Sequence, residues 1–158
     1  MARILILGIG NSIMSDEAAG VRAVEMFETL YGEEAEITCI DGGTLSFTLA
    51  EPIGAADQLV VFDAAQFHSG AGTVRRLEGD EMDAFVRSGK LSVHEVGLAD
   101  LFDMNRLSGD LPERRALIGI EPATLGWGTE LSSKVAVAIP QAVALARETL
   151  DAWNVASA

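Results

Sequence analysis

The residues that follow the first apolar run of the chain could support two different kinds of chemistry. Gly8 and Gly10 have the spacing of a glycine loop that holds phosphate, whereas Asp16 and Glu17 place two adjacent carboxylates at the start of the next helical pattern. Negative charge at a helix N-terminus repels a pyrophosphate. The segment LGIGNSIMSDEAAG, residues 7–20, therefore predicts either a nucleotide site or an acidic site.

The glycine pattern is a poor match to the nucleotide motifs. A dinucleotide fingerprint requires glycine or alanine three residues after the second glycine, and this chain has Ile13 there. Asp41, which follows the next apolar run, lies farther downstream than the ribose-binding acid of that motif. The sequence contains no Gly-Lys-Ser/Thr. Nucleotide binding is thus disfavoured, and a titration with adenine nucleotides would test it.

Both acids lie toward the apolar side of the helix that follows. On a helical wheel Asp16 falls in the arc of Ala23 and Phe27, and Glu17 falls at the border of that arc. The helix dipole alone favours acids in a first turn, so their presence also has a purely structural explanation. A carboxylate beside an apolar face is costly unless it is paired or bound to a cation. Their placement therefore favours a functional role.

Two further residues extend this acidic set. Asp63 lies near the end of the apolar run QLVVFDA, and His94 lies where an extended segment gives way to a helical one. The other histidine, His68, lies in a glycine-rich turn and is expected to be solvated. Carboxylates and imidazole suit divalent nickel, zinc, manganese or iron, and three ligands leave positions open for water or a substrate group. Glu17, Asp63 and His94 are therefore candidate metal ligands.

Other catalytic motifs do not match the sequence. HEVGL begins like the helical zinc-protease motif but has Leu98 where the second histidine must be, and no Gly-x-Ser-x-Gly occurs. The single cysteine, Cys39, lies in a strand-like segment and is expected to be a small buried residue and not a nucleophile.

The apolar pattern predicts the elements that position these residues. Apolar runs that alternate with helical patterns predict an α/β fold, with one domain over residues 1–158. This domain is expected to be a three-layer sandwich, with a mostly parallel, twisted sheet of about five strands and helices on both faces. Ligands of such sheets bind outside the carboxyl ends of the strands. Strands are predicted at 3–8, 36–41, 58–64, 72–79 and 114–122, and helices at 16–31, 45–56, 96–107 and 131–153.

Polar residues, a glycine and two prolines are expected to set the helix ends. Ser15 or Asp16 is the expected N-cap of the first helix, and Gly32 is its expected C-terminal stop. Pro52 is expected to end the second helix, and Pro140 to cause a kink or an offset start in the last one. The reason is that proline lacks the N–H that a helix interior requires.

Charge and composition narrow the expected partners. The 158 residues include 24 acidic and 11 basic side chains, which gives a net charge of -13. Neither nucleic acid nor an anionic membrane is an expected partner, because both bind proteins through clustered Lys and Arg. No apolar run is long enough for a signal-peptide core or a membrane span, and a lone cysteine suits a reducing compartment. We therefore expect a cytoplasmic protein, and nothing in the sequence requires more than a monomer.

Five segments, in this order and over nearly the whole chain, resemble the nickel-iron hydrogenase maturation endopeptidases. They are GIGNSIMSDEAAGVRAVE, DGGT, VVFDA, SVHEVGLADLF and IGIEP. The resemblance implies that Glu17, Asp63 and His94 bind the metal. It also implies that the chain removes a short C-terminal extension from the hydrogenase large-subunit precursor after nickel insertion. The nickel, carried by the precursor, would be the recognition signal, and other divalent metals could bind in vitro.

The resemblance leaves the mechanism open between two forms. In one, metal held between enzyme and precursor polarises the scissile carbonyl or lowers the pKa of a bound water. In the other, the three side chains only bind the nickel of the precursor, and Asp16 or Asp41 acts as the catalytic base. The similarity of DGG to the family site assigns Asp41, Gly42 and Gly43 to activity and substrate contact.

A binding protein is the main alternative to an enzyme. The same residues could serve a nickel-checking chaperone that holds the large-subunit precursor without shortening it. Substrate choice is expected to depend on exposed loops at residues 67–72 and 105–113.

Overall fold

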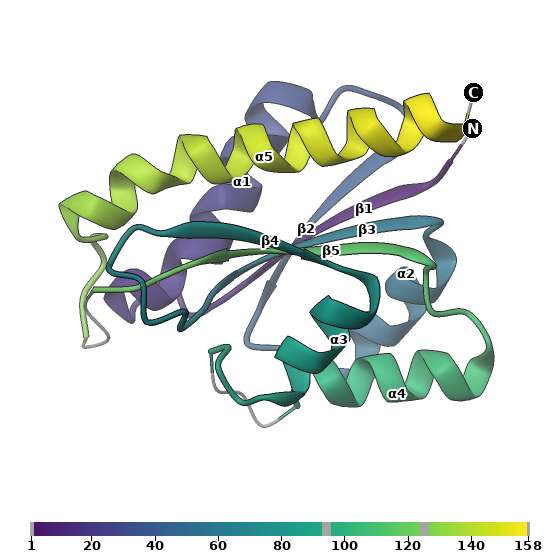
Figure 1. Cartoon of the computed structure of the whole chain (residues 1–158), viewed down its shortest axis with the longest axis horizontal. Helices are drawn as coiled ribbons and strands as arrows, with labels where there is room; N and C mark the ends of the chain where they lie inside the picture. Colours follow the sequence, from purple (N-terminus) through teal and green to yellow (C-terminus); the bar gives the residue numbers. More distant parts are fainter. Residues whose placement is uncertain (1, 93–95, 124–126, 158) are drawn as a thin grey trace.

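One sheet of five strands is formed within residues 2–92, 96–123 and 127–157, the parts of the chain that the computed structural model describes (Figure 1). The strands are β1 (Ile4–Ile9), β2 (Ile37–Gly43), β3 (Gln58–Ala64), β4 (Val74–Glu78) and β5 (Arg114–Ile120). Their order across the sheet is β2-β1-β3-β5-β4. The first four strands in this order pair in parallel, and β4 runs antiparallel to β5 at the edge.

Helices cover both faces of the sheet (Figure 1). They are α1 (Ala19–Tyr31), α2 (Ala50–Ala55), α3 (Gly79–Arg87), α4 (Leu98–Ser108) and α5 (Ser133–Ser157), with short 3-10 turns η1 (Ser15–Ala18) and η2 (Phe47–Leu49). α1 and α5 cover one face, whereas α2, α3 and α4 cover the other. The predicted fold class, an α/β three-layer sandwich around a mostly parallel sheet, is confirmed. No helix in the described parts of the chain is long and apolar enough to cross a membrane.

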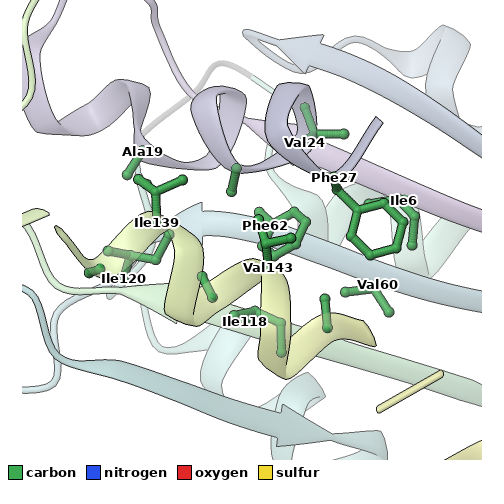
Figure 2. Packing of buried hydrophobic residues seen from close by; sticks show 14 of the residues in the cluster. Ile6, Ala19, Val24, Phe27, Val60, Phe62, Ile118, Ile120, Ile139 and Val143 are labelled. Carbon is green, nitrogen blue, oxygen red and sulfur yellow. The ribbon is translucent and has the colours of Figure 1, made fainter. Parts of the chain in front are cut away.

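Each face of the sheet has its own apolar core, because successive side chains of a strand point to opposite faces. Figure 2 shows the core beneath α1 and α5, where the rings of Phe27 and Phe62 lie 6.3 Å apart between centroids. Leu5 and Leu7 of β1 face the other core. All seven residues of β3 are buried, since helices cover both of its faces. This burial encloses Asp63, the one acid of the strand.

The first helix begins later than predicted. Residues 15–18 form the 3-10 turn η1, and α1 starts only at Ala19. The N-cap prediction for Ser15 and Asp16 is wrong. Ala18 occupies that position without a side-chain cap, and the Asp16 carboxylate bonds to a distant segment of the chain. Gly32 follows the last residue of α1, as predicted.

Pro52 does not act as predicted, whereas the kink expected at Pro140 stays a prediction. Pro52 is the third residue of α2 and does not end it, because N–H groups of a first turn have no helical acceptor and their loss costs little. Pro140 lies inside α5, which begins at Ser133, two residues later than predicted, and continues past the proline. Ala136, whose carbonyl loses its helical partner, is exposed, so water can bind this oxygen.

Two segments between the strands also differ from the prediction. α3 is not predicted by the sequence pattern, because its buried residues, Met82 and Val86, give only one helical repeat. Residues 105–113 are not simply an exposed loop, since α4 extends into them. Asn105 is buried, and its Nδ2 donates to Ala50 O at 2.9 Å and to Asp110 Oδ1 at 3.0 Å.

Candidate functional site

The glycine loop after β1 brings an acidic turn over the carboxyl end of the sheet. Gly10 has a φ of 146°, and a Cβ at this residue would lie 2.0 Å from the carbonyl oxygen of Glu17. Only glycine permits this approach of the loop to η1. The structure thus gives Gly10 a conformational role, as a spacer that lets the acidic turn pack against the end of β1.

Asp63 lies at the carboxyl end of β3 and is almost completely enclosed, with 1% of its surface exposed. Its Oδ1 accepts the N–H of Ala64 at 2.8 Å, and the Ser92 hydroxyl lies 2.7 Å from Oδ1 and 2.9 Å from Oδ2. Burial raises the pKa of Asp63 to about 8, although the bonds from Ser92 and Ala64 lower it. Ser92 is a site residue that sequence reasoning missed.

Glu17 is the second acid at this edge and is half-buried in η1. Burial raises the pKa of Glu17, and the charge of Glu17 further raises the pKa of Asp63. A negative charge beside a buried carboxyl group makes that group harder to ionise. The structure therefore brings Glu17 and Asp63 close enough for the charge of Glu17 to act on Asp63.

Two cavities adjoin this pair. The larger, of about 570 Å³, contains Glu17 in its wall, and the smaller, of about 200 Å³, contains Asp63. Gly89, Leu91 and Ser92 line both, so the segment 89–92 separates them. The larger cavity is lined by Asn11, Met14, Glu17, Ala64, Ala65, Gln66, Gly89, Lys90, Leu91, Ser92, Pro122 and Trp127.

The third predicted ligand, His94, lies outside the described residues. Within the described ranges, no group of three His, Cys, Asp or Glu side chains is arranged to hold a metal ion. Ser92, which bonds Asp63, is two residues before His94 in the chain. The described site therefore consists of two carboxylates and the segment that leads to the histidine.

Asp16, a predicted catalytic base, is enclosed beside Glu17. Its side chain is fully buried, with 0% exposed. Oδ2 accepts the N–H of Ala123 at 2.8 Å, and Oδ1 accepts the N–H of Ser132 at 2.7 Å. The Ser132 hydroxyl donates to Oδ2 at 2.7 Å. Asp16 thus links η1 to Ala123 and Ser132, and its role as a base stays a prediction.

The structure does not bring Asp41 to the pair of Glu17 and Asp63. Asp41 is exposed on β2, with Oδ1 accepting the N–H of Gly43 at 2.9 Å. The alternation along β2 places it on the face of Cys39, toward α1, whereas Asp63 lies on the opposite face. The strands β2 and β3 flank β1 and are therefore about 10 Å apart. The predicted catalytic role of Asp41 stays a prediction.

The two glycines after Asp41 have structural reasons for their identity. A Cβ on Gly42 would lie 2.8 Å from Leu7 Cδ1, and Gly43 has a φ of 49° in an irregular pairing with β1. Gly43 O accepts the N–H of Gly10 at 3.0 Å. DGG thus fixes the loop after β1, and its contact with substrate stays a prediction.

Glu121, which sequence reasoning missed as a positioning group, holds the segment after β3. Its carboxylate is buried and accepts the N–H groups of Phe67, Ser69 and Gly70 at 3.1, 3.0 and 3.2 Å. His68, on the same turn, is exposed, as predicted. The turn is therefore held in a single arrangement in spite of its glycines.

Comparisons with known proteins agree with this fold and identify the family of the chain. The sequence profile of the hydrogenase maturation protease family, HycI, matches residues 21–149. The chain is 39% identical over 155 residues to the hydrogenase expression/formation protein HupD of Rhizobium leguminosarum bv. viciae, covering 98% of this chain and 77% of that protein. It is 34% identical to the hydrogenase 2 maturation protease of Escherichia coli strain K12, covering 93% and 92%. The structure of the hydrogenase maturating endopeptidase HybD from E. coli superposes with a TM-score of 0.86 at 34% identity, covering 94% of this chain and 92% of that one.

Proposed function

Because this chain belongs to the hydrogenase maturation protease family, we propose that it is the endopeptidase that removes the C-terminal extension of a nickel-iron hydrogenase large-subunit precursor. The proposal includes the order of events, with cleavage following nickel insertion. It also includes nickel as the recognition signal, carried by the precursor as part of the substrate. The [NiFe] hydrogenase maturation protease HybD from Thermococcus kodakarensis has the same fold, at 27% identity and with a TM-score of 0.78.

One observation carries the nickel part of the proposal: the pairing of Glu17 with Asp63 at the carboxyl edge of the sheet. Both carboxylates have raised pKa values because they are removed from water. A divalent cation would offset their repulsion, and oxygen ligands with one imidazole suit nickel. In this proposal Glu17, Asp63 and His94 bind the nickel of the precursor, and other divalent metals can take its place in vitro.

The chain's own residues would then act by holding and orienting the precursor. Ser92 fixes the Asp63 carboxylate, so this ligand needs little rearrangement when the nickel arrives. The cavity beside Glu17 has room for the polypeptide next to the nickel site. Of the two mechanistic forms, activation of the scissile carbonyl or of a water by the metal is favoured, because Asp16 is enclosed and Asp41 lies on the other face of the sheet.

The test uses nickel-loaded and nickel-free precursor with the purified protein. The proposal predicts that the mass of the loaded precursor falls by one C-terminal fragment, and that the nickel-free precursor keeps its mass. Cleavage of both forms would contradict the nickel check. Stable binding of the loaded precursor without any loss of mass would identify the protein as the nickel-checking chaperone instead.

A further inference from the structure

A large aromatic side chain stands at the rim of the cavity beside Glu17. Trp127 lines this cavity, yet 79% of its surface is exposed. Ile13, on the segment that pairs with residue 128, is also 48% exposed. Burying such side chains against a partner removes a large apolar area from water. The rim therefore presents an apolar surface directly beside the acidic pair.

The backbone that carries Trp127 is held in place from the acidic turn. Gly128 N–H donates to Ile13 O at 2.9 Å, and Ser15 N–H donates to Gly128 O at 3.0 Å. These bonds belong to a parallel bridge between Met14 and Gly128. Trp127 is thus exposed but does not stand on a free loop end, so little conformational freedom remains to be lost when a partner covers it.

Asp16 fixes the same segment at two points. It accepts hydrogen bonds from Ala123 on one side of Trp127 and from Ser132 on the other. The buried carboxylate therefore joins both ends of the segment 123–132 to η1. Glu17, the next residue, faces the cavity, so one short turn positions the acidic group and the aromatic rim together.

We propose that Trp127 is a substrate-contacting residue, which packs against an apolar part of the precursor polypeptide next to the scissile bond, and that Asp16 is the positioning residue that holds it there. This inference rests on the proposed function, because it names a contact of the same substrate at the same site. Aromatic residues at fixed positions commonly carry much of the affinity of an interface. The occupant is expected to be apolar because Met14, Ala65 and Pro122 line the same cavity as Trp127.

The kinetic test compares four variants on nickel-loaded precursor. Trp127→Ala is expected to raise KM about tenfold or more and to leave kcat within about twofold, and Trp127→Phe is expected to recover most of the affinity. Asp16→Asn should raise KM as well, since an amide cannot accept all three hydrogen bonds. The matched control is Leu30→Ala, because Leu30 is 59% exposed but lies in the last turn of α1, at the end of the helix away from η1. Its KM should equal that of the unmodified protein.

A direct test needs no substitution at Trp127. The chain has two tryptophans, so 5-fluorotryptophan labelling gives two 19F resonances. Trp153, near the end of α5, donates its Nε1–H to Glu78 Oε1 at 3.0 Å and is not among the residues that line the cavity, so it serves as an internal reference. Addition of excess unlabelled, nickel-loaded precursor to the labelled, unmodified protein should shift the Trp127 resonance while uncleaved precursor remains, and should leave that of Trp153 in place.

Several outcomes would overturn this inference alone. They are an unchanged KM for Trp127→Ala, a fall in kcat at constant KM, or a Trp127 resonance that does not move while the precursor binds. A failure of the proposed function looks different, because the unmodified protein would then fail to shorten the loaded precursor at all.

Discussion

Glu17 and Asp63 are adjacent acids in very different surroundings. Asp63 is enclosed at the end of a buried strand and bonded by Ser92, whereas Glu17 reaches the wall of the cavity. The burial of Asp63 makes its carboxyl group harder to ionise, and the charge of Glu17 adds to this effect. With a pKa of about 8, Asp63 keeps its proton near neutral pH and so avoids a second negative charge beside Glu17.

Asp63 gives a testable pH dependence of stability. Its folded pKa of about 8 lies above the value of about 3.9 for an unfolded aspartate, so its contribution to stability is complete below the lower value. As the pH rises toward the folded pKa, the unfolded chain releases a proton that the folded chain keeps. The free energy of unfolding should then fall by up to about 1.4 kcal/mol per pH unit from this group.

Urea unfolding between pH 5 and 8 in the presence of a chelator measures this slope. The difference between the unmodified protein and Asp63→Asn isolates the contribution, because other titrating groups are shared. The decline should be shallower in Asp63→Asn. Parallel profiles for the two proteins would show that Asp63 is already ionised in the folded state.

The sequence identifies Glu17 and Asp63 as site residues but does not predict the groups that surround them. Glu17 and Asp63 could be found because strand ends of a parallel sheet meet at one edge. The role of Asp16 could not, since it depends on Ser132, more than a hundred residues away, and a helical wheel contains no information on such contacts. Ser92 is likewise hidden, because a serine in a polar segment is ordinary.

An ionic cluster joins α3, α4 and β5, and it leads to a second testable prediction. Asp83 of α3 accepts two bonds from Arg115 of β5, at 2.9 and 2.6 Å, and one from Arg106 of α4 at 2.7 Å. The side chains of Asp83 and Arg115 are only 14% and 12% exposed. Asp83→Asn leaves the nearly buried Arg115 without its close counter-ion, so the free energy of unfolding should fall by about 2 kcal/mol.

The matched control for this cluster lies on the same helix. Asp80 approaches Arg115 only to 3.9 Å and is fully exposed, so Asp80→Asn should have no measurable effect. Denaturant unfolding of both variants at pH 7 is the measurement. An equal effect of the two substitutions would mean that net charge, and not the buried cluster, matters here.

The same cluster explains why the sequence pattern does not predict α3. α3 is short and has few buried apolar residues, and it is held in part by Asp83, whose arginine partners come from other elements. Long or fully buried elements such as α5 and β3 were predictable because their apolar pattern repeats. Helix boundaries were harder to predict, since Asp16 of η1 is bonded to Ala123 and Ser132, which are distant in the sequence.

The whole molecule carries a charge of -13, which predicts a response to salt. Repulsion among the excess carboxylates destabilises the compact state, and salt screens it over about 10 Å at 0.1 M. Raising NaCl from 10 to 150 mM at pH 7 should increase Tm by roughly 2 to 4 °C. Calorimetry with KCl at the same ionic strength controls for specific ion effects. A constant or lower Tm would show that local ion pairs outweigh the net repulsion.

The fold class follows from the sequence because alternating strands and helices leave few other arrangements for the chain. The precise site does not, because its walls come from segments far apart in the sequence. Residues near positions 14, 65, 90, 122 and 127 meet at one cavity. Only the folded sheet determines which of these segments are neighbours.

The central claim is that the acidic pair, and not the glycine loop, carries the chemistry. The most direct test is the single-turnover rate on nickel-loaded precursor for Glu17→Gln, with Glu28→Gln on the exposed side of α1 as the matched control. The rate for Glu17→Gln should fall about a hundredfold or more, since even the loss of groups that only support a metal ligand costs up to that much, and thermal stability should be unchanged. The Glu28→Gln protein should cleave at the normal rate. Normal cleavage by Glu17→Gln would show that the acidic pair does not carry the chemistry.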